Sequence, residues 1–575
     1  MFRIKKRVGK YEYVIEQNQV WLVRLLGAAN AFGVLSLAWG YARFVQAEPI
    51  LLLMSPLFLL VVVYFAVNAL LLALYPGFSS KAHARLVKQY WQASAAAPSV
   101  TVFIPAAGEP LWTVARTAFA AAALHYDNKQ VYILDDTPEG KYRQIAIQSC
   151  VGYIHRPETG RGKKSGNLNY ALAHTPDSDH VLVLDADFVC RREMLREMVP
   201  YTASDIGIVQ TPQHFETSKH VFAQSKIAFG AGYVQRDFYR FIQVARNRFS
   251  SAICVGTNAL YNRRALSCIG GFAEVDHSED VNTGLRMMNH VREDGRPFRV
   301  RYVPVQLATG ECPDTYYGYY KQQNRWSTGS FRLVFSRFTV FSKVLRPAQK
   351  LIYFSNCLYY LYTIGILCMP LQFLLLVLIR HPDYHWGYTY FFVPQILLRL
   401  VVMPYVFRQR RKRLATILVT MCTAFTFAQA LYLLVIRRPL GWEATGATHK
   451  PRHNRFKQLK VFATVYFVLV VIGTAALAIL NEALGEHTAY LLQALFLFSL
   501  ASQAIHLVYL HLYSEGERPG RIPRQALTTL GVVGVIGAGA IMGAAGVHRQ
   551  YNFYVTGPSI GLSRQGLSTF SRVTR

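Results

Sequence analysis

Long apolar runs constrain this chain most, because about 20 consecutive apolar residues are needed to cross a bilayer as a helix. Two such runs lie near the N-terminus, at residues 20–42 and 50–75, and the short link between them predicts a helical hairpin. Hydrophobic residues make up 52% of the chain and charged residues only 16%, against roughly 25% in soluble domains. We therefore predict a multi-pass α-helical membrane protein. Further apolar runs lie at residues 351–379, 388–406, 414–436, 461–480, 489–510 and 527–545.

Basic loops predict how these runs cross the membrane, because loops rich in Lys and Arg stay in the cytoplasm. The loops 408–413 and 437–460 are both strongly basic, and they flank the apolar run 414–436. If that run spans the membrane once, its two flanking loops lie on opposite sides, so only one of them can be cytoplasmic. We therefore predict that residues 414–436 form an interfacial helix on the cytoplasmic face, which leaves seven spans and an outside C-terminus. The alternative is eight spans with one basic loop outside.

The net charge of +30 is compatible with nucleic acid, an anionic membrane face or an anionic substrate as partner. Many of the basic residues sit beside apolar runs, and no nucleic-acid-binding signature accompanies them, so we exclude nucleic acid. The eight cysteines form no CxxC motif or Cys/His cluster, which favours free thiols in a reducing compartment. The basic N-terminal segment lacks a short apolar core and a cleavage site, so we interpret it as a cytoplasmic tail.

The polar stretch at residues 76–348 alternates short β-rich segments with helix-like segments. Such alternation predicts a mostly parallel sheet that binds ligands at the carboxyl ends of its strands. The predicted strands are residues 100–104, 131–134, 180–184 and 206–210, and the predicted helices are residues 112–124, 167–173 and 192–199.

Paired acids follow two of the predicted strands. Asp135 and Asp136 follow one strand, and Asp185-Ala186-Asp187 follows another. Residues 185 and 187 point to the same side of an extended segment, so their carboxylates repel unless a cation lies between them. Oxygen ligands favour Mg²⁺ or Mn²⁺, and such ions usually also hold phosphates. A lone Asp-x-Asp is more often a turn or a cap, but two acidic sites in one sheet favour a nucleotide diphosphate.

Three further clusters each allow a structural and a functional interpretation. Ser278-Glu279-Asp280 is either a helix N-cap or carries a general base, and the two roles are compatible. The segment Gln322–Trp326 is either interface packing or a site where Arg325 binds phosphate oxygens and Trp326 stacks on a sugar ring. The segment 163–169, with two lysines and a glycine at a helix start, suits a phosphate site or an ordinary basic loop, and the sequence does not choose between them.

In order along the chain, these motifs resemble the family-two glycosyltransferases, and within them the cellulose synthase group. The resemblance covers roughly residues 76–450, and its last motif, Gln-x-x-Arg-Trp, marks processive synthases. It implies a cytoplasmic α/β GT-A (Rossmann-like) glycosyltransferase domain. The matching motifs are Asp135-Asp136, the Lys-Ser-Gly-Asn-Leu-Asn segment from Lys164, Asp185-Ala186-Asp187, Gln210-Thr211-Pro212, Cys254–Asn258, Ser278-Glu279-Asp280, and Gln322 with Arg325 and Trp326.

The resemblance also implies a role for each matching residue. Asp280 is the expected catalytic base, and Asp185 and Asp187 are the expected ligands of a Mg²⁺ or Mn²⁺ ion. The expected acceptor and diphosphate contacts are Cys254, Thr257, Gln322, Arg325 and Trp326. The expected nucleotide-binding residues are Glu109, Asp135, Asp136, Lys164, Asp185 and Asp187, although Glu109 alone remains of the Tyr-Asn-Glu that often ends the first strand.

A gating-type loop is expected after the interfacial helix, with Trp442 and Thr445 in the matching positions. The family's usual lysine is replaced there by Ala447, although Lys450 lies nearby. The predicted divisions are therefore an N-terminal tail and hairpin (1–75), the transferase domain (76–348), transmembrane helices (349–413), the interface helix and loop (414–460), C-terminal helices (461–547) and a tail (548–575).

The predicted function is processive, inverting polymerisation of a UDP-sugar and transfer of the chain across the cell (inner or plasma) membrane. UDP-glucose giving a β-1,4-glucan is preferred. The alternatives are UDP-N-acetylglucosamine, with a chitin- or hyaluronan-like product, and transfer of a single sugar to a lipid carrier. The expected partners are the UDP-sugar, the growing polysaccharide and the lipid bilayer. For the basic tail we weigh an envelope accessory protein against a disordered end, and favour the latter.

Overall fold

The structure is a computed structural model that describes residues 9–47, 49–94, 96–217, 226–275, 277–313, 315–378, 391, 393–407, 413–438 and 454–483. The chain divides into two compact units, of which the larger contains residues 1–367, 385–459 and 513–518. The sheets, the candidate site and the contacts described below lie in this larger unit. In the smaller unit, the described residues are 368–378 of helix α14 and 460–483 of helix α19.

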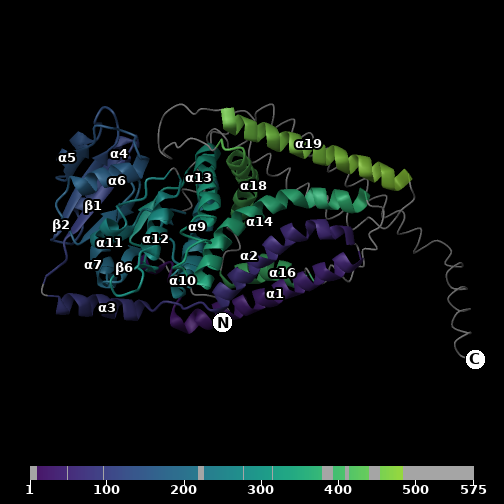
Figure 1. Ribbon diagram of the computed structural model, residues 1–575, viewed down its shortest axis with the longest axis horizontal. Helices are drawn as coiled ribbons and strands as arrows, with labels where there is room; N and C mark the ends of the chain where they lie inside the picture. The colour runs from purple at the N-terminus through teal and green to yellow at the C-terminus, as the bar shows by residue number, and fades with distance from the viewer. Residues whose placement is uncertain are drawn as a thin grey trace, which may run out of the picture. The chain divides into compact units, whose positions relative to one another are not determined.

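A seven-stranded sheet with the order β3-β2-β1-β4-β8-β6-β9 forms the centre of the polar domain (Figure 1). β8 runs antiparallel to β4 and β6, and the other neighbouring strands are parallel. The predicted mostly parallel sheet is therefore confirmed. The strands are β1 (Val100–Ala106), β2 (Lys129–Asp135), β3 (Gly152–His155), β4 (His180–Val183), β6 (Ile206–Gln210), β8 (Ala259–Asn262) and β9 (Arg299–Tyr302).

A smaller sheet and several helices complete this domain. The small sheet has the order β5-β10-β7, with β5 (Val189–Cys190), β10 (Ala308–Gly310) and β7 (His214–Phe215). The helices are α3 (Ser80–Ala93), α4 (Leu111–Ala122), α5 (Arg143–Gln148), α6 (Lys163–Ala173), α7 (Met194–Met198), α9 (Lys226–Asp237), α10 (Gln243–Arg248), α11 (Arg263–Cys268), α12 (Glu279–Asn289) and α13 (Tyr316–Val334).

The central strand β1 is buried along its whole length, because both faces of the sheet are covered. Successive side chains of a strand point to opposite faces, and here they enter two different apolar clusters. Phe103 packs in one cluster with Leu168 of α6, whereas Val102 and Ile104 pack in the other with Val114 of α4. This two-sided packing fixes the strand ends, from which the candidate site residues emerge.

The N-terminal apolar runs form the two helices α1 (Val20–Ala47) and α2 (Ser55–Ala73), which pack against each other (Figure 1). Within the described part of the chain, two segments are long and apolar enough to cross a membrane, Gln17–Gln46 and Leu51–Ala73. The hairpin prediction therefore has structural support, while the multi-pass topology stays a prediction. The predicted runs 489–510 and 527–545 lie outside the described residues.

The remaining described helices are α14 (Pro347–Leu378), α16 (Val393–Leu397), the π-helical turn η6 (Leu398–Val402), α17 (Met403–Val406), α18 (Arg413–Val435) and α19 (Asn454–Ala483).

Helix α18 coincides with the predicted interfacial helix and packs against α13 and α9 of the polar domain. The Tyr320 hydroxyl donates to Gln429 Oε1 at 2.6 Å, and Gln429 Nε2 donates to the Arg455 carbonyl at 3.0 Å. These bonds tie α18 to α13 and to the start of α19. Its position at a membrane face stays a prediction, and Trp442 and Thr445 of the expected gating loop lie outside the described residues.

Candidate active site

A cavity of about 1710 Å³ opens at the carboxyl ends of β1, β2 and β4. Acidic side chains from the loops after these strands line one part of it, and polar side chains of α1, α2, α14 and η6 line another. The cavity therefore joins the end of the sheet to the long apolar helices. Of the residues predicted from the sequence, those that line it are Glu109, Asp136, Lys164, Asp185, Asp187, Asp280, Gln322, Arg325 and Trp326.

Asp185 and Asp187 follow β4 as predicted, and Glu109 lines the cavity with them. Burial, followed by the charges of Asp185 and Glu109, raises the pKa of Asp187 to about 7. Burial also raises the pKa of Glu109, and Asp185 adds to the effect. Repelling carboxylates of this kind, all oxygen donors, fit a Mg²⁺ or Mn²⁺ ion that substrate oxygens would help to hold. Among the described residues, no group of three or more His, Cys, Asp or Glu side chains is arranged to hold a metal ion.

Lys164 lies in the first turn of helix α6 and reaches across the acidic end of the cavity. Its ammonium group pairs with Asp185 and donates to the Gly256 carbonyl at 2.8 Å. Burial alone lowers the pKa of Lys164, but Asp185, Glu279 and Asp280 outweigh burial and raise it. Lys164 therefore stays charged and links the Asp185 carboxylate to the loop that faces Asp280.

The neighbouring acids Asp135 and Asp136 have different surroundings. Asp135 is fully buried, and its two oxygens accept hydrogen bonds from Thr137, Tyr142 and Tyr153 at 2.6–2.9 Å. It shapes the loop behind the cavity wall, so its predicted nucleotide contact stays a prediction. Asp136 borders the cavity and accepts a two-point bond from the Arg156 guanidinium at 2.7 and 2.6 Å.

Asp280 lies in the first turn of α12, where the helix N-terminus favours negative charge. Gly256 packs directly on it, and a Cβ added to Gly256 would lie 2.9 Å from the Asp280 Cβ. Burial first, and then the charge of Glu279, raises the pKa of Asp280 to about 7. Such a carboxylate accepts a proton near neutral pH, which a general base requires.

Cys254 and Thr257 were predicted to lie near an acceptor, but both are buried behind the cavity wall. Cys254 Sγ lies 3.1 Å from the Tyr261 hydroxyl, and Thr257 Oγ1 accepts from the backbone N–H of Asp185 at 2.8 Å. Their neighbours Ile253 and Val255 border the cavity instead. In this structure the two residues support the wall and hold the Asp185 loop.

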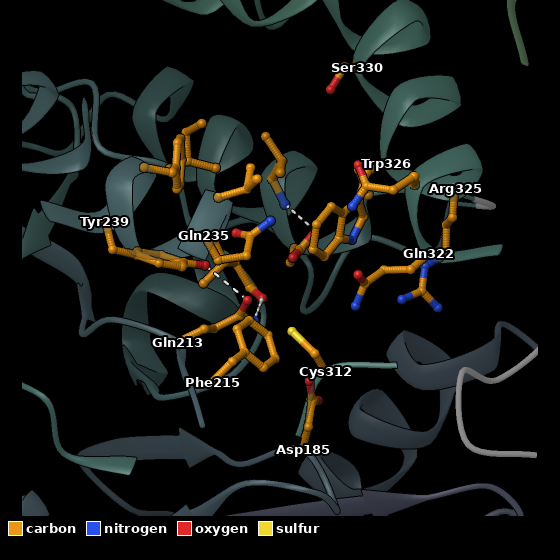
Figure 2. A pocket seen from close by; sticks show the side chains of 18 of the residues that line it. Asp185, Gln213, Phe215, Gln235, Tyr239, Cys312, Gln322, Arg325, Trp326 and Ser330 are labelled. Carbon is orange, nitrogen blue, oxygen red and sulfur yellow. Dashed lines mark hydrogen bonds between the residues drawn. The ribbon is translucent and has the colours of Figure 1, made fainter. Parts of the chain in front are cut away.

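Helix α13 presents Gln322, Arg325 and Trp326 along one wall of the cavity (Figure 2). Thr315 caps this helix, because its hydroxyl accepts from the Gly318 N–H at 3.1 Å. One turn after Trp326, Gly329 packs against Ser278 so closely that a Cβ would lie 1.9 Å from the serine hydroxyl. The glycine thereby brings the Gln-x-x-Arg-Trp helix against Ser278, the residue that precedes helix α12 and lies two positions before Asp280.

Several cavity residues were not predicted from the sequence. Figure 2 shows Tyr239 and Gln213 across the cavity from Trp326, and the Tyr239 hydroxyl donates to Gln213 Oε1 at 2.9 Å. Gln213 directly follows the Gln210-Thr211-Pro212 motif, and this position beside a motif could have marked Gln213 as a candidate site residue. Tyr239 lies in a mixed helical stretch with no local motif, so its position became visible only in three dimensions. Gln235, Cys312 and Ser330 also line the cavity.

Comparison with known proteins finds a matching family model and similar cellulose synthases. Residues 97–329 match the model of the family described as "Glycosyltransferase like family 2". The cellulose synthase 1 catalytic subunit [UDP-forming] of Komagataeibacter xylinus is 30% identical over 284 residues, which are 48% of this chain and 37% of that protein. Putative cellulose synthase 2 of the same organism is 32% identical over 288 residues, 48% of this chain and 18% of that protein.

The solved structure of glucosyl-3-phosphoglycerate synthase from Mycobacterium tuberculosis, in complex with Mn²⁺ and UDP, has a TM-score of 0.26 and 15% identity. It covers 41% of this chain and 77% of its own, and these values are too low to support an inference about activity. Over residues 97–329, the sheet and the family match together support a GT-A-like α/β glycosyltransferase fold.

Residues 97–329 thus resemble a family-two glycosyltransferase domain, and the similar proteins named above, which match about half of this chain, are cellulose synthases. The match covers 37% of the length of the first of these relatives and 18% of the length of the second.

Proposed function

We propose that this protein is a processive, inverting β-glycosyltransferase that polymerises a UDP-sugar and passes the chain into its membrane helices. One observation carries the proposal: a single cavity contains both the acidic site at the sheet and polar side chains of α1, α2 and α14. A transferase that only modifies a soluble acceptor has no need of this extension. UDP-glucose is the preferred donor, because both named relatives are called cellulose synthases and one of them is called UDP-forming.

The cavity residues divide into a donor side and an acceptor side. Glu109, Asp136 and Lys164 surround the place where a nucleotide would lie beside Asp185. A divalent ion held by Asp185 and Asp187 would neutralise charge on the diphosphate oxygens. Arg325 and Gln322 would bind those oxygens as the diphosphate leaves, because both line the cavity and a guanidinium forms paired bonds with phosphate. The ring of Trp326 offers an apolar face on which the terminal sugar of the polymer stacks.

Transfer then needs a single proton movement at Asp280. The acceptor hydroxyl oxygen attacks the anomeric carbon, the bond from that carbon to the diphosphate breaks, and UDP leaves with the bonding electrons. Asp280 takes the hydroxyl proton, and the configuration inverts because attack and departure occur on opposite faces of the sugar. A raised pKa of about 7 suits Asp280 to this step, since a general base works best near the ambient pH.

The helix-lined part of the cavity provides the path for the product. Asn30 of α1 accepts a hydrogen bond from Gln395 Nε2 at 2.8 Å, and both side chains are buried. Asn68, Ser355 and Tyr360 also line the cavity. Polar and aromatic groups at these positions would replace the water contacts of a hydroxyl-rich chain, which lipid does not offer.

The proposal is tested by UDP release from the purified protein supplied with UDP-glucose or with UDP-N-acetylglucosamine. Asp280→Asn should lower UDP release by about 10²- to 10⁴-fold, the usual contribution of a general base. Asp177→Asn is the matched control, because the Asp177 carboxylate is 99% exposed and lies outside the cavity lining, and it should leave the rate unchanged.

Product length on a sizing gel separates polymerisation from transfer of a single sugar. Long products support the proposal, whereas one sugar per acceptor would overturn processivity. Full activity of Asp280→Asn would overturn the assignment of the base.

A further inference from the structure

A fully buried arginine connects the transferase domain to the cavity-lining helix α14. Arg246 of α10 is 0% exposed and has no carboxylate partner in the described structure. Its Nε donates to the Ser251 carbonyl at 2.9 Å, and its Nη1 donates to the Ile352 carbonyl at 3.2 Å and to Asn356 Oδ1 at 2.8 Å. The guanidinium also lies over the ring of Tyr353, 4.9 Å from its centroid.

This arrangement lowers the stability of the fold, so stability alone does not explain it. A buried cation held only by neutral oxygens loses its hydration without the attraction of an opposite charge. Burial lowers the pKa of Arg246 to about 10, so the group is still charged at neutral pH. Its Nη2 has no hydrogen-bond partner among the described residues. An apolar side chain would fill the same space at lower cost, which indicates that the orientation of the partners matters.

The partners on one side belong to the loop that leads to the catalytic site. The Tyr353 hydroxyl donates to the Ala252 carbonyl at 3.1 Å, and Gln349 Nε2 donates to the Ser250 carbonyl at 3.0 Å. These bonds, with the Arg246 bond to Ser251, fix residues 250–252 against the first turns of α14. Four residues later the same chain reaches Gly256, which packs on Asp280.

The partner on the other side is Asn356, which lines the cavity. Arg is a pure donor, so the contact at 2.8 Å must be made by the oxygen of the Asn356 amide. Arg246 therefore fixes the orientation of that amide and directs its NH₂ group away from itself. In the cavity, Asn356 then acts as a hydrogen-bond donor. Ser355 and Tyr360 line the cavity nearby on the same helix.

We propose that Asn356 binds a hydroxyl or ring oxygen of the polymer as it leaves the transfer site, and that Arg246 is the positioning residue that orients it. The inference deepens the proposed function and rests on it. Asn356 binds the polymer between additions of sugar. The contacts of Arg246 connect Asn356 to residues 250–252, which lead to the loop beside Asp280. Loss of the donor lets the chain dissociate sooner, which shortens the product without removing the base.

Asn356→Asp tests the donor role sharply, because the variant keeps an oxygen for Arg246 and replaces the NH₂ group by a second oxygen. We expect about a tenfold shorter mean product, the effect of losing one hydrogen bond at a desolvated site. The mean product length should fall by a larger factor than the initial rate of UDP release with a short acceptor oligosaccharide, since Asp280 and Arg325 are intact. Asn128→Asp, the same chemical change at an exposed site of the transferase domain, is the matched control and should keep product length.

Arg246→Lys tests the positioning role, because lysine keeps the charge but cannot make both contacts. It should shorten the product like Asn356→Asp, and the double variant should be no worse than either single variant. Product of wild-type length from Asn356→Asp would overturn the inference while leaving the proposed function standing. UDP release without any polymer from the wild-type protein would instead overturn the proposed polymerisation, and with it this role for Asn356.

Discussion

At the scale of single residues, the protonation of Asp280 decides when transfer is possible. Burial and Glu279 raise the pKa of Asp280 to about 7, while Lys164 and Arg325 act in the opposite direction. A base works only in its deprotonated form, so the rate should fall with a slope of one in log units as the pH drops below about 7. Initial UDP release measured across about pH 5.5 to 9 gives this midpoint.

Glu279→Gln should move that midpoint to lower pH, because removing a neighbouring negative charge stabilises the ionised form of Asp280. Glu293→Gln is the control, since Glu293 is 95% exposed and pairs with Arg264 at the surface. It should leave the midpoint in place. A midpoint that stays unchanged in Glu279→Gln would assign the acidic limb to another group.

The sequence predicted residue types better than it predicted which side chains reach the cavity. Asp135 and Asp136 are adjacent in the sequence, yet only Asp136 borders the cavity, because consecutive side chains at a strand end point to opposite sides. Cys254 and Thr257 likewise lie behind the wall formed by Ile253 and Val255. Local spacing does not predict such choices, since they depend on how the loop meets neighbouring elements.

At the scale of elements, the contact between α13 and the loop before α12 sets the geometry of the site. A Cβ on Gly329 would lie 1.9 Å from Ser278 Oγ and 2.7 Å from Ser278 Cβ. Gly329→Ala should therefore push α13 away from Asp280 and cost about 1–3 kcal/mol of stability. We expect a lower melting temperature in detergent and UDP release reduced about tenfold or more, since small displacements of reacting groups are costly.

Ser278→Gly should suppress this defect, because it removes both clashing atoms at a residue whose φ of 52° suits glycine. In the Ser278→Gly background, Gly329→Ala should then have little further effect on melting temperature or rate. Gly365→Ala is a control for the substitution itself, since the nearest atom to its Cβ is 3.6 Å away. An equal loss in both backgrounds would show that the contact with Ser278 is not the cause.

The elements themselves were largely predictable, because alternation of β-rich and helical segments reflects burial in a two-sided sheet. β6 (Ile206–Gln210) coincides with the predicted strand, and β1 and β2 extend theirs by a few residues. β8 (Ala259–Asn262) was missed, since four residues after a loop motif give no periodic signal. Its antiparallel insertion between β4 and β6 is a long-range feature that no local pattern records.

At the scale of the whole molecule, the cavity relates the transferase domain to the apolar helices. Charge and hydropathy predicted the two parts separately, but the shared cavity follows only from side chains that lie far apart in the sequence, such as Asn30, Asp280 and Asn356. Asn30 Nδ2 lacks a hydrogen-bond partner among the described residues, so a buried donor borders the path. A buried polar group without a hydrogen-bond partner destabilises the fold unless a ligand forms a hydrogen bond with it.

Sealed inverted membrane vesicles test whether the product follows that path. With the transferase domain outside and UDP-sugar supplied there, the polymer should collect inside, where an added glycoside hydrolase reaches it only after detergent. Asn30→Leu should reduce the protected fraction severalfold, because an apolar side chain cannot replace the donor that a hydroxyl-rich chain would meet. Asp280→Asn should give no polymer in either compartment. Product digested equally with and without detergent would contradict passage through the helices and leave the transferase assignment intact.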